Sequence, residues 1–258
     1  MYPMLEVSVV GRIATITLNQ PEKRNALGPQ MVAALKSELK KQLEQEDVKI
    51  ILLAAQGPAF CSGADLEYLK QIRNFSDEDN LNDSQNLREL FDLIYNSNKI
   101  IVSKVNGPAL AGGCGLATIC DYCIASDTAK FGYTESRIGF IPALVMVYLR
   151  QRIQGAAMRD LLLSARILEA AEAKQLGLVD AVVPSENLDA YIGEFLNGLL
   201  TSVSGSSIAL IKEMLRELPG KNMTEALDYA ARMNMKARRT EDCMRGIDSF
   251  LNKEKIQW

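Results

Sequence analysis

The stretch NGPALAGGCGL (residues 106–116) carries the strongest structural signal in this sequence. It follows the apolar run IIVSKV (residues 100–105), which predicts a buried strand, and it leads into LATIC (residues 116–120), which predicts the start of a helix. Glycines at such a junction let the backbone approach a ligand without side chains in between. Free N–H groups at a helix start favour negative charge. The stretch therefore predicts a place that can hold an oxyanion.

A second stretch of the same kind is AFCSGADL (residues 59–66). It follows IILLAA (residues 50–55), a continuous apolar run typical of a strand that is covered on both faces. N–H groups from two such turns can converge on one oxygen atom, although ordinary tight turns use the same residues. Neither stretch matches a dinucleotide-binding or phosphate-binding loop, because the Gly-x-Gly-x-x-Gly and Gly-Lys-Ser/Thr patterns are missing.

The remaining sequence predicts strands and helices in alternation. Apolar and amphipathic patterns predict strands at 7–10, 13–18, 122–125, 130–132 and 178–184 and helices at 29–45, 87–95 and 205–252. The first two strands flank Gly11-Arg12 and predict a β-hairpin. The polar segment 74–86 fits either a surface loop or a helix start. Strands alternating with helices indicate βαβ crossovers and a parallel sheet in the first two thirds of the chain.

Composition narrows the chemistry. The chain has 258 residues, a net charge of −3 and no histidine, which excludes Ser-His-Asp and Cys-His catalysis and any His-ligated metal. General acid–base work falls to Asp, Glu, Lys, Tyr or Cys. The mild acidity gives no reason to expect a nucleic-acid partner, and no apolar run reaches membrane-spanning length. Without a secretory pattern at the N-terminus, we expect a cytoplasmic protein that binds no metal and no membrane.

The cysteines are odd in number. The chain contains Cys61, Cys114, Cys120, Cys123 and Cys243. In the absence of an export signal, an odd count favours reduced thiols. Cys120 and Cys123 have the spacing of a redox pair, but cysteine is also a common small core residue, and we favour the core interpretation.

Several motifs occur in a fixed order. After the hairpin come KRNAL (residues 23–27), FCSGADL (60–66), NGPALAGGCGL (106–116), FGYTESRIGFIP (131–142) and AAEAKQLGLV (170–179). This ordered set resembles the crotonase superfamily, the enoyl-CoA hydratases and isomerases, nearly from end to end. The resemblance implies an α/β fold with a crotonase-like ββα spiral core in residues 1–200. It also implies a helical C-terminal oligomerisation region in residues 201–258 and assembly as a homotrimer or homohexamer.

The resemblance also implies a reaction centre. The superfamily binds acyl-CoA thioesters, so coenzyme A would be part of the substrate and no separate cofactor is expected. By position, the backbone N–H groups of Ser62 and Gly112 would hold the thioester oxygen while charge develops on it, and losing one such donor typically costs about 10²–10³ in rate. Glu135 would be the catalytic glutamate, with a pKa raised by burial. The alternative is a surface glutamate or a partner of Arg137.

For the coenzyme A moiety, the resemblance implies a second group of residues. Arg24 and Ala26 would lie near the phosphate and adenine end, and the adenine pocket would be lined by Ala64, Asp65 and Leu66. An arginine near phosphate is electrostatically favourable. Lys23 and Arg24 are equally compatible with a plain solvated pair.

Two departures from the hydratase pattern bear on the reaction. Gly115 stands where hydratases of the superfamily usually carry a second glutamate, and ALVMVY (residues 143–148) replaces a glycine-rich stretch. The larger side chains either reshape the wall beside Glu135 or pack in a helix core. Hydration needs an oriented water, whereas double-bond migration needs one base. Isomerisation is therefore slightly favoured, with 2-enoyl-CoA hydration and a non-catalytic acyl-CoA-binding or scaffold role as alternatives.

Overall fold

A six-stranded sheet forms the centre of the structure, a computed structural model that describes residues 3–256 and 258. Its strands, in spatial order, are β1 (Leu5–Val10), β2 (Ile13–Leu18), β3 (Ile50–Ala55), β4 (Ile100–Val105), β6 (Tyr122–Ser126) and β9 (Ala181–Val183). The first two form the predicted antiparallel hairpin, and every later neighbouring pair is parallel. The spatial order of these strands is the same as their order in the sequence. The four parallel pairs confirm the predicted parallel sheet.

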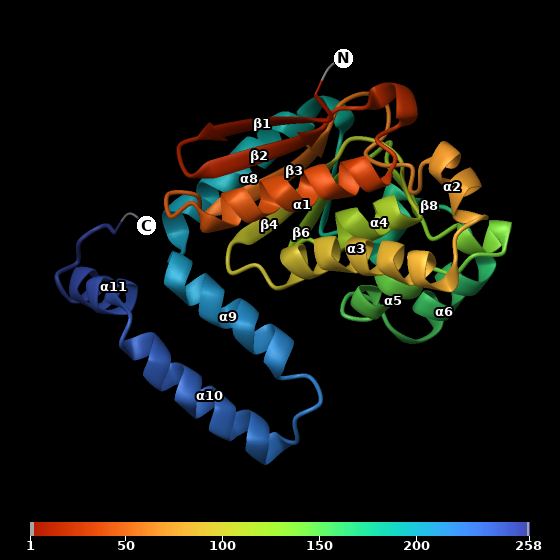
Figure 1. Ribbon diagram of the computed structural model, residues 1–258. Coiled ribbons are helices and arrows are strands. Elements are labelled where there is room, and N and C mark those ends of the chain that lie inside the picture. Colours follow the sequence, from red (N-terminus) through yellow and green to blue (C-terminus); the bar gives the residue numbers. More distant parts are fainter. Residues whose placement is uncertain (1–2, 257) are drawn as a thin grey trace.

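Helices cover both faces of this sheet (Figure 1). Successive side chains on a strand point to opposite faces. Accordingly, Ile51 and Leu53 of β3 pack in the larger core cluster, and Ile50 and Leu52 pack in the smaller one. The larger cluster includes residues of α1 (Pro29–Glu44), α3 (Asp77–Tyr95) and α4 (Gly112–Thr118), and the smaller one includes residues of α8 (Leu188–Ser202). Burial on both sides explains why β3 is apolar throughout.

A smaller sheet lies beside the main one and combines three short strands: β5 (Ala109–Leu110), β7 (Lys130–Gly132) and β8 (Leu168–Glu169). β5 and β7 are parallel, and β7 and β8 are antiparallel. The predicted extended piece at 130–132 is confirmed as β7. This sheet organises the candidate site described below.

The polar segment 74–86 belongs mostly to a helix. Ser76 caps α3, because its hydroxyl accepts from the Asp79 N–H while the Asp79 carboxylate accepts from the Ser76 N–H. This reciprocal capping satisfies two otherwise unpaired donors and fixes the helix start at Asp77. The remaining helical elements are η1 (Pro21–Lys23), α2 (Leu66–Ile72), η2 (Glu135–Ile138), α5 (Ala143–Leu149), α6 (Gly155–Ser164), α7 (Ala170–Gln175), η3 (Ser185–Asn187), α9 (Gly205–Glu217), α10 (Met223–Arg238) and α11 (Glu241–Leu251).

Helices α9, α10 and α11 form an arm that extends away from the sheet (Figure 1). The arm is attached to the body through the buried Lys212, whose ammonium donates to Asp121 at 2.5 Å and to the Lys99 carbonyl at 2.8 Å. Exposed apolar side chains on the arm are Ile211, Leu215, Met223, Leu227, Met235, Met244, Ile247, Phe250 and Leu251. Within the described chain, no helix has both the length and the apolar character required to cross a bilayer.

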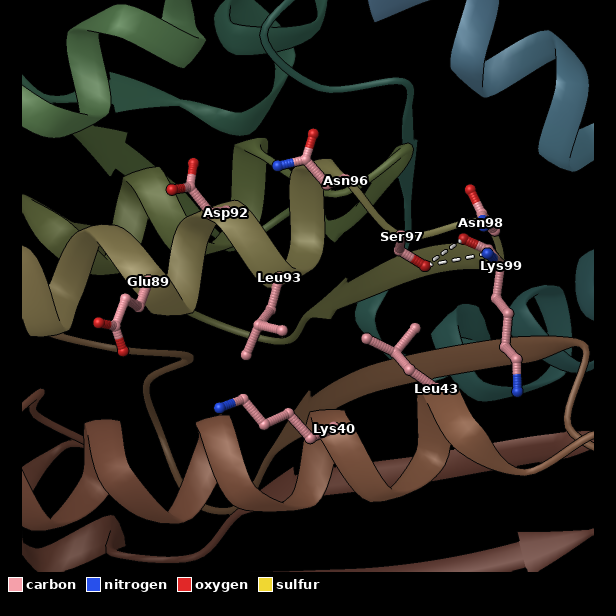
Figure 2. Close-up of a pocket in the computed structure, with 9 residues that line it drawn as sticks. All are labelled: Lys40, Leu43, Glu89, Asp92, Leu93, Asn96, Ser97, Asn98 and Lys99. Carbon is pink, nitrogen blue, oxygen red and sulfur yellow. Dashed lines mark hydrogen bonds between the residues drawn. The ribbon is translucent and has the colours of Figure 1, made fainter.

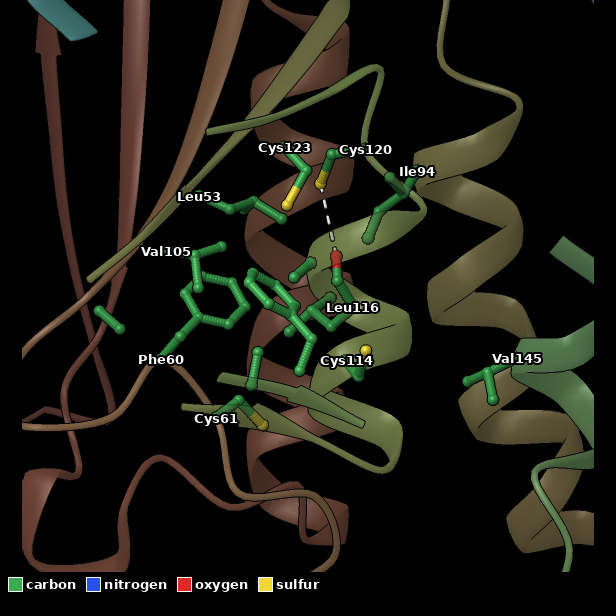
Figure 3. Packing of buried hydrophobic residues seen from close by; sticks show 14 of the residues in the cluster. Leu53, Phe60, Cys61, Ile94, Val105, Cys114, Leu116, Cys120, Cys123 and Val145 are labelled. Carbon is green, nitrogen blue, oxygen red and sulfur yellow. Dashed lines mark hydrogen bonds between the residues drawn. The ribbon is translucent and has the colours of Figure 1, made fainter. Parts of the chain in front are cut away.

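All the cysteines except Cys243 lie in the core rather than in a redox site (Figure 3). Four of them are buried free thiols, including Cys120 and Cys123. Burial raises the pKa of Cys61 and Cys114 to about 12 and that of Cys123 to about 11. A thiol that resists ionisation is a poor nucleophile. The core interpretation of Cys120 and Cys123 is therefore confirmed.

Candidate active site

Three parallel chain segments bring the predicted site residues to one edge. Cys61 bridges Ala109 of β5, and Ala109 pairs with Phe131 of β7. The bridge is held by the Leu110 N–H, which donates to the Cys61 carbonyl at 2.9 Å. The carboxyl ends of parallel segments meet at the same edge. The residues that follow them, FCSGADL (60–66), AGGCG (111–115) and YTE (133–135), therefore come together.

The glycine-rich turn after β5 enters its helix earlier than predicted. α4 begins at Gly112 rather than at Leu116. Ala111, just before it, has φ 49° and ψ −126°, a conformation that favours glycine and costs a non-glycine residue about 1–3 kcal/mol. This strained residue turns the chain so that the Gly112 N–H has no hydrogen-bond acceptor among residues 3–256 and 258. A free backbone donor is what the sequence predicts at this position.

The two turns are in direct contact, and glycine makes the contact feasible. A Cβ on Gly113 would lie 2.2 Å from the Cys61 carbonyl oxygen, which is closer than any real contact allows. A Cβ on Gly63, which has φ +93°, would lie 2.9 Å from the Ala111 Cβ and 3.6 Å from the Gly112 nitrogen. The two turns are therefore packed against each other, whereas the convergence of their N–H groups on one oxygen atom stays a prediction.

The second predicted donor, Ser62, is engaged elsewhere. Its N–H donates to the Arg24 carbonyl at 3.0 Å, so it is not available to a ligand. Ala64, two residues after Ser62, forms a parallel bridge with Leu27. In this bridge the Leu27 N–H donates to the Gly63 carbonyl, and the Asp65 N–H donates to the Leu27 carbonyl. In an extended segment the intervening N–H faces the opposite side. The Ala64 N–H accordingly finds no acceptor in the described part of the chain, and Ala64 replaces Ser62 as the candidate donor.

Glu135 is a half-buried carboxylate rather than a surface residue. It follows β7 and the fully buried Tyr133. Its Oε2 atom is buried and has no hydrogen-bond partner in the described structure, and burial raises the pKa of Glu135. Among the described residues, Arg137 forms no ion pair with Glu135, and its guanidinium donates to the Ala165 carbonyl at 2.6 Å instead. A desolvated carboxylate without a structural partner is suited to accepting a proton.

The raised pKa of Glu135 makes stability depend on pH. Between the ordinary pKa of a glutamate and the raised value, the folded state binds more protons than the unfolded state. The contribution of Glu135 to the free energy of unfolding therefore falls as the pH rises. Glu135→Gln removes this titration, so its melting temperature relative to the parent should increase from roughly pH 4 to neutral pH. A difference that stays constant over this range in thermal denaturation would contradict the raised pKa.

The residues predicted for the nucleotide end lie next to one another. Ala26 and Asp65 line a pocket of about 250 Å³ with Lys23, whose ammonium pairs with Asp65 at 3.2 Å. Asp65 caps α2, and the Tyr68 N–H, followed by Lys23, holds the pKa of this carboxyl below its usual value. Leu66 is 76% exposed. Arg24 is exposed as well and has no ion-pair partner within residues 3–256 and 258.

Asn25 is a positioning residue that sequence reasoning missed. It is fully buried with φ 54°, and its side chain accepts from the Gln20 N–H and donates to the Gln56 and Ala59 carbonyls. These bonds tie the loop that carries Arg24 to the segment before the second turn. The only sequence signal is a polar residue between the cationic pair 23–24 and the apolar pair 26–27.

A larger pocket, of about 520 Å³, is lined by other residues (Figure 2). It is formed by the second halves of α1 and α3 and the segment after α3, and it is lined by Lys40, Leu43, Glu89, Asp92, Leu93, Asn96, Ser97, Asn98 and Lys99. None of the predicted site residues lines it. Although this pocket is the larger of the two, we therefore assign it no role in the predicted chemistry.

Comparisons with known proteins bear directly on this geometry. Residues 9–258 match the family model described as enoyl-CoA hydratase/isomerase. The chain is 39% identical to a Thermus thermophilus protein that is named as an enoyl-CoA hydratase. The match covers 94% of this chain and 96% of the relative. It is 32% identical to the mouse protein named enoyl-CoA hydratase domain-containing protein 3, mitochondrial, over 95% of the chain and 81% of the relative.

Solved structures agree with the sequence relatives. An enoyl-CoA hydratase from Shewanella pealeana superposes with a TM-score of 0.94 at 28% identity, covering 99% of this chain and 96% of that one. An enoyl-CoA hydratase from Mycobacterium smegmatis gives a TM-score of 0.92 at 27% identity, covering 100% and 99%. The crotonase resemblance and the predicted fold class are confirmed. The chain therefore belongs to the enoyl-CoA hydratase/isomerase family of enzymes.

Proposed function

We propose that the protein is an acyl-CoA enzyme that forms a thioester enolate and moves a double bond with one carboxylate. The observation that carries this proposal is the buried Oε2 atom of Glu135, which has no hydrogen-bond partner among the described residues. Glu135 comes shortly after β7, which pairs with β5, the strand that leads into Gly112. The backbone N–H groups of Gly112 and Ala64 supply two donors without acceptors among the described residues. A base and a pair of fixed donors at one edge are what enolate chemistry requires.

The reaction follows from these roles. The Glu135 carboxylate takes a proton from C2 of a 3-enoyl thioester, and the electron pair of that C–H bond forms the enolate. Negative charge then develops on the thioester oxygen, where the Gly112 and Ala64 N–H groups stabilise it. Return of the same proton at C4 gives the 2-enoyl thioester. Atoms and charge balance without water.

The coenzyme A moiety belongs to the neighbouring residues in this proposal. Arg24 is an exposed cation without an ion-pair partner in the described part of the chain, and it is suited to a phosphate group. Ala26 and Asp65 line the pocket beside it, and Leu66 offers an exposed apolar side chain for the adenine. We further propose a homotrimer or homohexamer, because the C-terminal arm leaves many apolar side chains exposed. Light scattering would give the mass of the assembly.

Two thioesters distinguish isomerisation from hydration. A 3-enoyl-CoA should gain the absorbance of a conjugated 2-enoyl-CoA when the protein is added. A 2-enoyl-CoA should lose that absorbance at less than about one tenth of the isomerisation rate, since one carboxylate serves proton transfer but does not also orient water. Faster loss of conjugation with addition of water would assign the protein as a hydratase. Binding without turnover of either thioester would assign it as a non-catalytic acyl-CoA-binding protein.

A further inference from the structure

Position 115 has no room for a side chain, and Val145 is the reason. A Cβ on Gly115 would lie 2.2 Å from Val145 Cγ1 and 2.8 Å from Val145 Cβ, both shorter than any real contact. Phe91 lies next, with its Cζ 3.6 Å from the same point. Gly115 is outside the positive-φ region. Crowding by the neighbouring helix, rather than backbone conformation, therefore restricts this position to glycine.

The crowded position faces the candidate site. Gly115 follows Gly112 by three residues on α4, so the two lie on the same face of the helix. Val145 reaches this face from α5, and Figure 3 draws it in the same buried cluster as Cys114 of α4. Glu135 lies close enough to raise the pKa of Cys114, although burial is the larger cause. The Gly115–Val145 contact therefore lies on the helix face that also carries Gly112, the candidate donor.

We propose that Val145 is a specificity-determining residue that keeps a second carboxylate out of the site and closes that wall to water. This inference rests on the proposed function. Val145 is 5% exposed and Phe91 is fully buried, so the wall beside position 115 is apolar. A bound water needs two to four polar partners, and neither side chain offers one. This apolar wall offers a water no hydrogen-bond partner, so in the proposed reaction Glu135 moves the proton without a second carboxylate from position 115.

The packing half of this proposal has a thermal test. Gly115→Ala should lower the melting temperature by roughly 2–12 °C, because its Cβ overpacks against Val145. In a Val145→Gly background, Gly115→Ala should lower the melting temperature by less than it does in the parent, since the Val145→Gly change removes the clashing atoms. Gly193→Ala is the matched control, because it also changes a helical glycine but has open space around its Cβ. A Gly115→Ala variant as stable as the parent would overturn the proposal.

The specificity half is tested with the two thioesters. Gly115→Glu/Val145→Gly should hydrate 2-enoyl-CoA at least about tenfold faster than either single variant, because loss of the Val145 side chain makes room for a second carboxylate at position 115. Equal hydration by Gly115→Glu alone, or no gain in a folded double variant, would overturn the role of Val145. Inactivity of the parent toward both thioesters would instead overturn the proposed function, and the thermal result separates the two failures.

Discussion

Glu135→Gln lowers turnover of an acyl-CoA substrate by about 10²–10⁴-fold while the variant still binds the thioester. The amide is nearly isosteric with the carboxylate but cannot accept the proton. Binding persists because Glu135 makes no ion pair in the structure and the residues proposed for coenzyme A lie elsewhere. Steady-state rates and calorimetric titration with a saturated acyl-CoA measure the two effects separately.

The matched control for this variant is Glu194→Gln. Glu194 is an exposed carboxyl on α8, which covers the opposite face of the main sheet. The control should retain full turnover and full affinity. Full activity in Glu135→Gln would remove Glu135 from the mechanism, and loss of binding together with turnover would make it a structural residue.

The second large effect is expected from Gly113→Ala. The new Cβ would lie 2.2 Å from the Cys61 carbonyl oxygen and 2.7 Å from its carbonyl carbon. Backbone atoms cannot rotate away as a flexible side chain can, so the two turns must separate. Overpacking of this kind costs about 1–3 kcal/mol, and a displacement of about 1 Å at the donors can lower the rate about 10²-fold. Thermal denaturation and the rate with a 3-enoyl-CoA give both numbers.

Gly198→Ala controls for the general effect of replacing a helical glycine. A Cβ on Gly198 in α8 would meet no atom of the described residues within 4 Å, so this variant should be as stable as the parent or more stable. If Gly113→Ala matched this control in stability and rate, the close contact between the two turns would not be required for positioning the backbone donors.

Much of the fold was predictable from side-chain periodicity. The hairpin and the continuously apolar β3 follow from residue patterns that report burial directly. The start of α3 was harder to predict, because its first turns are polar and only the Ser76–Asp79 capping pair identifies the helix. The start of α4 was placed too late, because the glycines that look like a loop form the first turn of the helix.

The site was predictable only to the level of its segments. Which backbone N–H is free depends on the orientation of each peptide, and residue type does not report that. The bridge between Leu27 and Ala64 frees the Ala64 donor, while the bond to Arg24 occupies that of Ser62. Similarly, Gly115 signals a missing carboxylate in the sequence, but its contact with Val145 appears only when α4 and α5 are packed.

The central claim is that Glu135 moves the proton next to the thioester carbonyl, and hydrogen exchange measures that step alone. The protein is incubated in deuterium oxide with an acyl-CoA whose acyl chain is saturated, and incorporation of deuterium at C2 is followed by mass spectrometry. The parent should exchange this position well above the uncatalysed background, and Glu135→Gln should fall to that background. Equal exchange by the parent and Glu135→Gln would contradict the account.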